Sequence, residues 1–91
     1  MTILSEASCP TLAPHVVLRR DEARSRWVIL APERVLVPDE TAAEVVGMTD
    51  GKATIAEIVD RLAEKYAAPR EEIAGDVLEM LQDLAEQGYL K

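Results

Sequence analysis

The alternation of apolar and polar positions divides the chain into a first part with strand periodicity and a second part with helix periodicity. Apolar residues at every second position predict strands over 15–20 and 26–31, separated by a polar loop. A tight corner then leads into a short third strand over 34–37, and Pro38 ends it because proline has no N–H to donate to a ladder. The pattern predicts a three-stranded antiparallel meander.

The third strand differs from the first two because its apolar residues, Val35, Leu36 and Val37, are consecutive. A short apolar run rich in β-branched residues is typical of a strand covered on both faces. The strand also stands last in the meander, so we expect it to lie at the edge of the sheet. We expect its free side, next to the last helix, to carry the function.

The segment after this strand predicts two helices. Asp39 is suited to cap a first helix over about 40–49. Thr54 and Glu57 form a capping box at the start of a second helix, in which each side chain satisfies a free backbone donor near the other residue. The apolar residues of the second helix recur at helical spacing, at Ile55, Ile58, Val59, Leu62 and Tyr66.

A longer third helix is predicted over about 70–87, and Gly88 suits the left-handed position after its end. Leu78 and Ala85 widen its apolar stripe to roughly 160°, more than one core-facing side requires. Either one flank of this helix faces a partner, or the other helices wrap around it; the pattern leaves both open. The order predicts an α+β, winged helix-turn-helix-like fold, with a three-stranded antiparallel sheet followed by a three-helix bundle (β-β-β-α-α-α).

The first residues carry no periodic pattern. We expect residues 1–14 to be a flexible N-terminal arm or linker and residues 15–91 to be a single domain. Cys9 is most simply a free thiol in this arm, because a nucleophilic thiol needs an activating base held near it. A single cysteine excludes an internal disulfide, and a single histidine, His15, excludes a His-paired metal site. We therefore expect no metal and no cofactor.

Targeting and membrane signals are missing from the sequence. No run of about 18 apolar residues occurs, which is the length needed to span a bilayer as a helix. The N-terminus lacks the basic and then apolar order of a signal peptide. We expect a cytoplasmic protein with no membrane partner.

The charge distribution bears on nucleic-acid binding. The formal net charge is −7; residues 1–38 hold five arginines against four acids, whereas residues 39–91 hold five bases against thirteen acids. A winged helix that binds DNA would place its third helix in the major groove. Here that helix carries six acids against Arg70 alone, so phosphate would repel it. A winged-helix DNA-binding regulator is kept as the alternative function, and we expect no nucleic-acid partner.

Motifs of catalysis are not found. The sequence has no Gly-rich phosphate loop, no HExxH motif, and no Ser/His/Asp set that one histidine could serve. The acids of the third helix fall on its solvent side, where carboxyl groups lack the burial that shifts a pKa for acid–base work. We expect a binding module and not an enzyme. An apolar edge strand beside a helix can accept an extended peptide as an added strand.

Several segments resemble the PqqD family, small peptide-binding proteins of pyrroloquinoline quinone (PQQ) biosynthesis. The most specific stretch is WVILAPERVL at 27–36. The resemblance covers nearly the whole chain from Pro10, and Pro38-Asp39 departs from it where a strand-like apolar residue is expected. The other similar segments are Pro10-x-Leu12, Val16-Val17-Leu18, Glu40-Thr41-Ala42, Asp50-Gly51, Ile55-Ala56-Glu57-Ile58, Asp76-Val77 through Leu84, and Gly88-Tyr89-Leu90.

The resemblance implies a peptide chaperone of the RiPP recognition element type, without catalytic activity. Such proteins bind the ribosomally made precursor peptide PqqA by strand addition. They present it to PqqE, a radical S-adenosylmethionine (SAM) enzyme, in a ternary complex. Some members resemble the C-terminal part of a fusion with PqqC. The chain could be such a domain, with residues 1–14 as its linker.

The resemblance also implies where the peptide lies, beside the third strand and against the third helix. Met80 can instead be ordinary core, Arg34 can instead form a salt bridge with the first helix, and Trp27 is expected to pack. The flank of Leu78 and Ala85 is the other choice on the third helix. The expected peptide-binding residues are Arg34, Val35, Leu36 and Val37 on the strand and Asp76, Met80, Asp83 and Gln87 on the helix.

Overall fold

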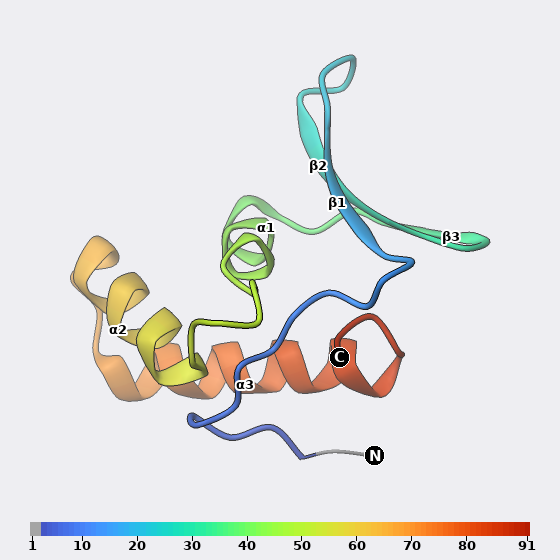
Figure 1. The fold of residues 1–91 in the computed structure, drawn as a ribbon. Helices are drawn as coiled ribbons and strands as arrows, with labels where there is room; N and C mark the ends of the chain where they lie inside the picture. The colour runs from blue at the N-terminus through green and yellow to red at the C-terminus, as the bar shows by residue number, and fades with distance from the viewer. Residues whose placement is uncertain (1–2) are drawn as a thin grey trace.

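The structure is a computed structural model that describes residues 3–91. Three strands form one antiparallel sheet of order β1-β2-β3, and three helices follow it, as predicted (Figure 1). The α+β, winged-helix-like fold expected from the sequence is thus confirmed. The elements are β1 (Val17–Asp21), β2 (Arg26–Ala31), β3 (Arg34–Leu36), α1 (Glu40–Gly47), α2 (Ile55–Tyr66) and α3 (Arg70–Glu86).

The register of the sheet assigns each side chain to one of two faces. Leu18, Ile29 and Leu36 lie opposite one another across the three strands and face the helices. The neighbouring row consists of Val17, Leu30 and Val35, and successive side chains along a strand point to opposite faces. This second row therefore belongs to the outer face of the sheet, away from the helices.

The expectation that both faces of β3 are covered is wrong. Leu36 packs against the core, whereas Val35 and Val37 are 60% and 53% exposed. The consecutive apolar residues have a different physical reason. Leu36 packs against the core, and Val35 and Val37 form part of the protein surface beside the free edge of the sheet.

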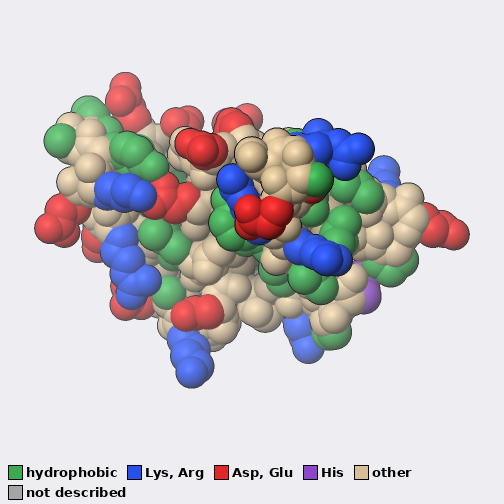
Figure 2. Space-filling view, turned by 90° about the horizontal axis from the view of Figure 1, so that it is seen from above, with side chains coloured by type: hydrophobic (Ala, Val, Ile, Leu, Met, Phe, Trp, Pro, Cys, Tyr) green, Lys and Arg blue, Asp and Glu red, His purple; other side chains and the backbone are tan. Residues whose placement is uncertain are grey.

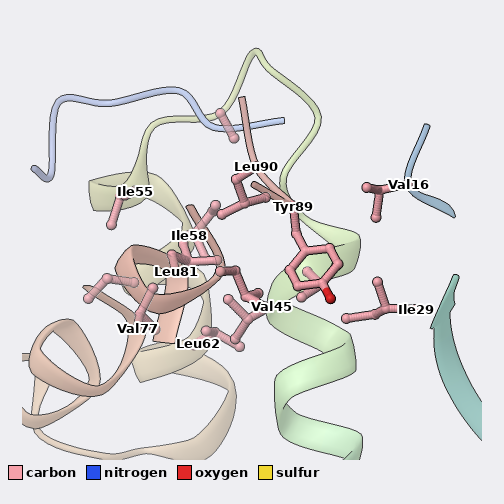
Figure 3. Close-up of a cluster of buried hydrophobic side chains, with 14 of the residues drawn as sticks. Val16, Ile29, Val45, Ile55, Ile58, Leu62, Val77, Leu81, Tyr89 and Leu90 are labelled. Carbon is pink, nitrogen blue, oxygen red and sulfur yellow. The ribbon is translucent and has the colours of Figure 1, made fainter. Parts of the chain in front are cut away.

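The helices enclose an aliphatic core on the inner side of the sheet. Ile55, Ile58 and Leu62 of α2 pack with Leu81 of α3 in the centre of this core (Figure 3). Tyr89 follows α3 and directs its ring toward the sheet (Figure 3). The predicted capping box at the start of α2 is present, because Thr54 accepts the amide of Glu57 while Glu57 accepts the amide of Thr54.

The described part of the expected N-terminal arm, residues 3–14, differs from a loose segment. The amides of Ile55 and Gly51 donate to the carbonyls of Ser8 and Pro10, at 2.9 and 3.0 Å. Further along, the amide of Ala13 donates to the carbonyl of Tyr89 at 2.9 Å. Backbone groups hold this segment, and they leave no periodic signal in the side chains. Residues 1–2 of the expected arm lie outside the described residues.

One flank of α3 faces this N-terminal segment. The amide of Leu4 donates to Oε1 of Gln82 at 2.7 Å, and Leu4 and Pro10 line a hollow together with Ala85. Leu78 lies on the same side of the helix, because residues four and seven positions apart share a face. The wide apolar stripe therefore has two uses here: its centre packs in the core, and this flank packs beneath residues 4–10.

Candidate functional site

The free edge of β3 is the first part of the candidate site. A two-residue turn joins β2 to β3, with Glu33 in the left-handed region at φ 64°, and Ala31 stands opposite Arg34. The residues that flank such a turn pair by hydrogen bonds, and pairing then alternates along the ladder. By this rule the amide and carbonyl of Val35 point away from β2. They lie on the edge that a further strand would use.

Arg34 does not form the salt bridge with α1 that was one of its two expected roles. Its guanidinium donates a hydrogen bond to the hydroxyl of Tyr89, with 3.2 Å between Nη1 and the oxygen. Among residues 3–91, no ion pair involves Arg34. Arg34 shares the inner face of β3 with Leu36, so it ties the start of the edge strand to the chain end that follows α3.

A hollow between α1 and α3 is the second part of the candidate site. Its volume is about 150 Å³, and Met80 is the half-buried side chain that lines it from α3. Asp39 lies at its rim and caps α1 by accepting the amide of Ala42 at 2.7 Å. The remaining lining residues are Thr41, Ala42, Val45, Asp76 and Val77. Met80 also packs against the core cluster, so it contacts both environments.

Asp83 and Gln87 continue the same side of α3 toward its end. The side-chain amide of Gln87 donates to Oδ2 of Asp83 at 3.0 Å. Asp76, Met80, Asp83 and Gln87 lie on one helix side, since they are spaced by three or four residues. The structure thus places the four expected helix residues on the flank opposite Ala85, which lines the hollow beneath the N-terminal segment. Gln82 lies between the two flanks, because it lines a shallow hollow with Asp76, Met80 and Asp83 and also accepts the amide of Leu4.

Trp27 lies near the hairpin end of the sheet, away from the β3 edge. It is half-buried, and the guanidinium of Arg20 lies 5.6 Å from the centre of its ring. It lines a hollow with Ala43 and Tyr66 of the helices. This position fits the packing role expected of Trp27.

A polar cluster between α1 and α2 is not apparent from the sequence. Glu44 of α1 accepts hydrogen bonds from the Lys65 ammonium and from the Tyr66 hydroxyl of α2. These two bonds, that from Lys65 first, lower the pKa of Glu44. The spacing of 21 and 22 residues between the partners gives no local motif, and the contact depends on how the helices pack.

Within residues 3–91, no group of three or more His, Cys, Asp or Glu side chains is arranged to hold a metal ion. No helix in this range has the length and apolar character needed to cross a membrane.

The comparison with known families decides the assignment. The sequence model of the family described as Coenzyme PQQ synthesis protein D (PqqD) matches residues 26–90, from the start of β2 to the residues after α3. The chain belongs to the PqqD family. The matched range contains both β3 and the candidate flank of α3.

Relatives in the PqqD family align along almost the full chain. The PqqA binding protein of Rhodopseudomonas palustris (strain BisB5) is 56% identical over 87 residues, which cover 96% of this chain and 85% of the relative. The PqqA binding protein of Xanthomonas campestris pv. campestris (strain B100) is 41% identical over 91 residues, which cover 100% and 99%.

Two solved PqqD structures resemble the fold. The solution NMR structure of the PqqD truncation of Methylobacterium extorquens PqqCD has a TM-score of 0.83 at 38% identity, over 97% of this chain and 94% of that one. That relative is described as a functional and stand-alone RiPP recognition element. The crystal structure of PqqD from Xanthomonas campestris has a TM-score of 0.58 at 40% identity, over 92% and 93% of the two chains.

Proposed function

We propose that this protein is a peptide chaperone of PQQ biosynthesis, without catalytic activity of its own. It binds the precursor peptide PqqA as an added strand and presents it to the radical SAM enzyme PqqE in a ternary complex. The relatives named PqqA binding protein support PqqA as the peptide that is bound. The exposed edge of β3 supports strand addition as the mode of binding. We place this activity in the cytoplasm, where ribosomally made peptides are produced.

The single observation that carries the proposal is the unpaired sheet edge of β3, which the hydrogen bond from Arg34 to Tyr89 ties to the chain end after α3. β3 pairs with β2 on one side only, so the outward amide and carbonyl of Val35 are available to a peptide. An extended peptide there turns alternate side chains toward the helices, where Met80 offers an adaptable apolar surface. The proposed contacts are Arg34, Val35, Leu36, Val37, Asp76, Met80, Asp83 and Gln87.

The residues of this proposed site have different roles. Val35 and Val37 bind chiefly through their backbone. Leu36 holds β3 on the core, and Arg34 fixes its start through Tyr89. Asp76 lines the rim of the hollow with Met80, where a carboxylate disfavours an acidic peptide side chain and favours a basic one.

DNA binding, the alternative function, gains no support from the geometry. Glu79 and Glu86 are exposed on α3, and Asp83 lies between them on the same surface. Phosphate groups would meet this acidic surface in any docking that uses α3 as a recognition helix.

The proposal is tested by removing the outward backbone donor of the edge strand and comparing this variant with one that changes the side chain but keeps the donor. Val35→Pro deletes the outward N–H on an edge strand, where proline is tolerated, and Val35→Thr keeps that N–H with a β-branched side chain. We expect Val35→Pro to weaken the binding of synthetic PqqA by about ten-fold, and Val35→Thr to change it by about two-fold or less. Isothermal titration calorimetry on variants with native circular dichroism gives both affinities.

Amide NMR shifts make the same test by position. Addition of PqqA to the labelled protein should shift the amides of residues 34–37 and of one flank of α3. A folded Val35→Pro variant that binds PqqA as tightly as the wild type would contradict strand addition. Unchanged spectra of the wild type at high PqqA excess would contradict peptide binding by the isolated chain altogether.

A further inference from the structure

The outer face of the sheet carries a second surface, which shares only Val35 with the proposed peptide site: the peptide uses its backbone, and the outer face presents its side chain. All three helices lie on the inner side, so no helix covers the opposite face, although Val28 on that face is only 7% exposed (Figure 1). Val17, Leu30 and Val35 form one row across the three strands of this face. Val17 and Val35 are more than half exposed. The row is an apolar strip on an otherwise charged surface.

Arginines surround this strip. Arg19 follows Val17 on the same face of β1, two residues along, and stands opposite Val28. Arg20, Arg24 and Arg26 line a hollow of about 590 Å³ together with Arg19 and the apolar Val28, Leu30 and Val35. Seen from above, Lys and Arg side chains lie close to hydrophobic ones near the middle of the molecule (Figure 2).

Local acids neutralise only part of this charge. Asp21 forms ion pairs with both Arg24 and Arg26, at 3.4 and 3.6 Å. Although burial raises the pKa of Asp21, the hydrogen bonds from Arg24 and the charges of both arginines lower it overall, so the carboxylate stays ionised at neutral pH. Glu22 lies 3.8 Å from Arg20.

Arg19 is the arginine left over. Within residues 3–91, its side chain forms no ion pair. Four arginines and two acids line the hollow, so its lining has an excess of positive charge in a protein of net charge −7. A basic patch on an acidic protein favours an acidic partner surface over a neutral or basic one.

We propose that the outer face of the sheet is a second docking surface, which takes an acidic segment of the peptide-modifying enzyme with an apolar side chain seated on Val17, Leu30 and Val35. The choice of occupant rests on the proposed function. Charge complementarity defines the chemistry of this enzyme segment. It carries carboxylates that pair with Arg19 and its neighbours, and an aliphatic or aromatic residue that packs on the strip.

The position of this surface suits an enzyme that must take over a bound peptide. A peptide added at the β3 edge lies beside that strand in the plane of the sheet and leaves the outer face open. The new strand also extends that face, because every second peptide side chain points outward beside Val35. An enzyme docked on the outer face would therefore meet the peptide without displacing it from its edge.

The test exploits two exposed arginines that differ only in place. Arg19→Glu reverses a charge on the outer face, and Arg61→Glu makes the same reversal on α2, where Arg61 forms no ion pair with any described residue. Val17→Asp, at a half-exposed position of β1, changes the strip independently of Arg19. Each folded variant is titrated with purified PqqE and, separately, with synthetic PqqA.

We expect Arg19→Glu and Val17→Asp each to weaken PqqE binding by about ten-fold relative to Arg61→Glu. The same variants should bind PqqA within about two-fold of the wild type. The affinity of the wild type for PqqE should fall with added salt, and the Arg19→Glu variant should show a shallower fall.

The other outcomes overturn the inference in distinguishable ways. Equal PqqE affinities of Arg19→Glu and Arg61→Glu remove the outer face as the docking surface, while the proposed function stands. Loss of PqqA binding in both outer-face variants would show that the face belongs to the peptide site. Sedimentation that reveals a self-associated wild type and a monomeric Arg19→Glu variant assigns the face to a second copy. A wild type that binds PqqA but not PqqE removes the presentation step itself.

Discussion

The guanidinium of Arg34 and the hydroxyl of Tyr89 join the first residue of the edge strand to the chain end, across 55 positions of sequence. Tyr89 is buried, with 3% of its surface exposed, so its hydroxyl depends on this partner. We expect Tyr89→Phe to lower the free energy of unfolding by about 0.5–1.5 kcal/mol, the net contribution of one hydrogen bond. Urea unfolding measures it.

A double-mutant cycle isolates this bond from other losses. In the background of Arg34→Ala, Tyr89→Phe should cost markedly less than in the wild type, because the partner is already gone. Equal costs in both backgrounds would mean that the Arg34–Tyr89 bond contributes nothing to stability and that Phe acts by another route.

The two flanks of α3 should separate affinity from stability. Met80 lines the hollow beside α1, whereas Leu78 lies on the side of the N-terminal segment; both are half-buried. Met80→Ala and Leu78→Ala should each lower stability, by about 1–3 kcal/mol. Only Met80→Ala should also weaken PqqA binding, by about ten-fold, in titrations well below the unfolding temperature. If Leu78→Ala weakens PqqA binding as much as Met80→Ala does, the Met80 flank of α3 is not the specific peptide-binding flank.

Acid should weaken the link between α1 and α2. Hydrogen bonds from Lys65 and then Tyr66 lower the pKa of Glu44 from its ordinary value of 4.5. A carboxyl whose pKa is lower in the folded state stabilises fully above its ordinary pKa, and this stabilisation is lost as pH falls through the folded value. The contribution of Glu44 is therefore present at pH 7 and fades below about pH 4.5.

Glu44→Gln should reveal this dependence in thermal unfolding. At pH 7 the variant should melt lower than the wild type, on the order of 3 °C, and the gap should close toward pH 3. Glu64→Gln is the matched control, an exposed glutamate of α2 with no ion pair to a described residue. If the difference in unfolding temperature stays constant from pH 7 to pH 3, the charge of Glu44 is not the source of its stabilising effect.

Two glycines should respond to alanine in opposite directions. Gly75 lies within α3, and a methyl group there would meet no atom within 4 Å, so Gly75→Ala should stabilise the protein by about 0.5–1 kcal/mol. Gly88 has φ +86°, which strains any residue with a Cβ atom, so Gly88→Ala should destabilise it by about 1 kcal/mol or more. Chemical unfolding of both variants checks the signs.

Local signals in the sequence predicted much of the fold. The alternation in β2 and the capping box of α2 are interactions between near neighbours, and the bounds of both elements follow from them. The pairing of residues 6–13 with residues 51–56 and with the chain end is not local. It uses backbone groups, which every residue type supplies, so the side-chain pattern of this segment carried no trace of it.

The candidate site was predictable in outline and not in orientation. The edge position of β3 follows from the order of the strands, but the exposure of Val35 does not, since an apolar residue on an open face breaks the rule that the pattern uses. In the sequence, Asp21 and Glu22 likewise stand among the arginines and offset part of their positive charge. Only the sheet register gathers Arg19 and the valines into one surface.

The path of the N-terminal segment has a practical meaning for assembly. The amide of Leu4 is bound to α3 at Gln82, and this part of the chain lies on the far side of α3 from the sheet (Figure 1). An affinity tag, a fluorophore or another folded unit joined ahead of this segment would block neither the β3 edge nor the outer face of the sheet. That end is the natural point of attachment to a sensor surface, because both proposed binding surfaces then face the solution.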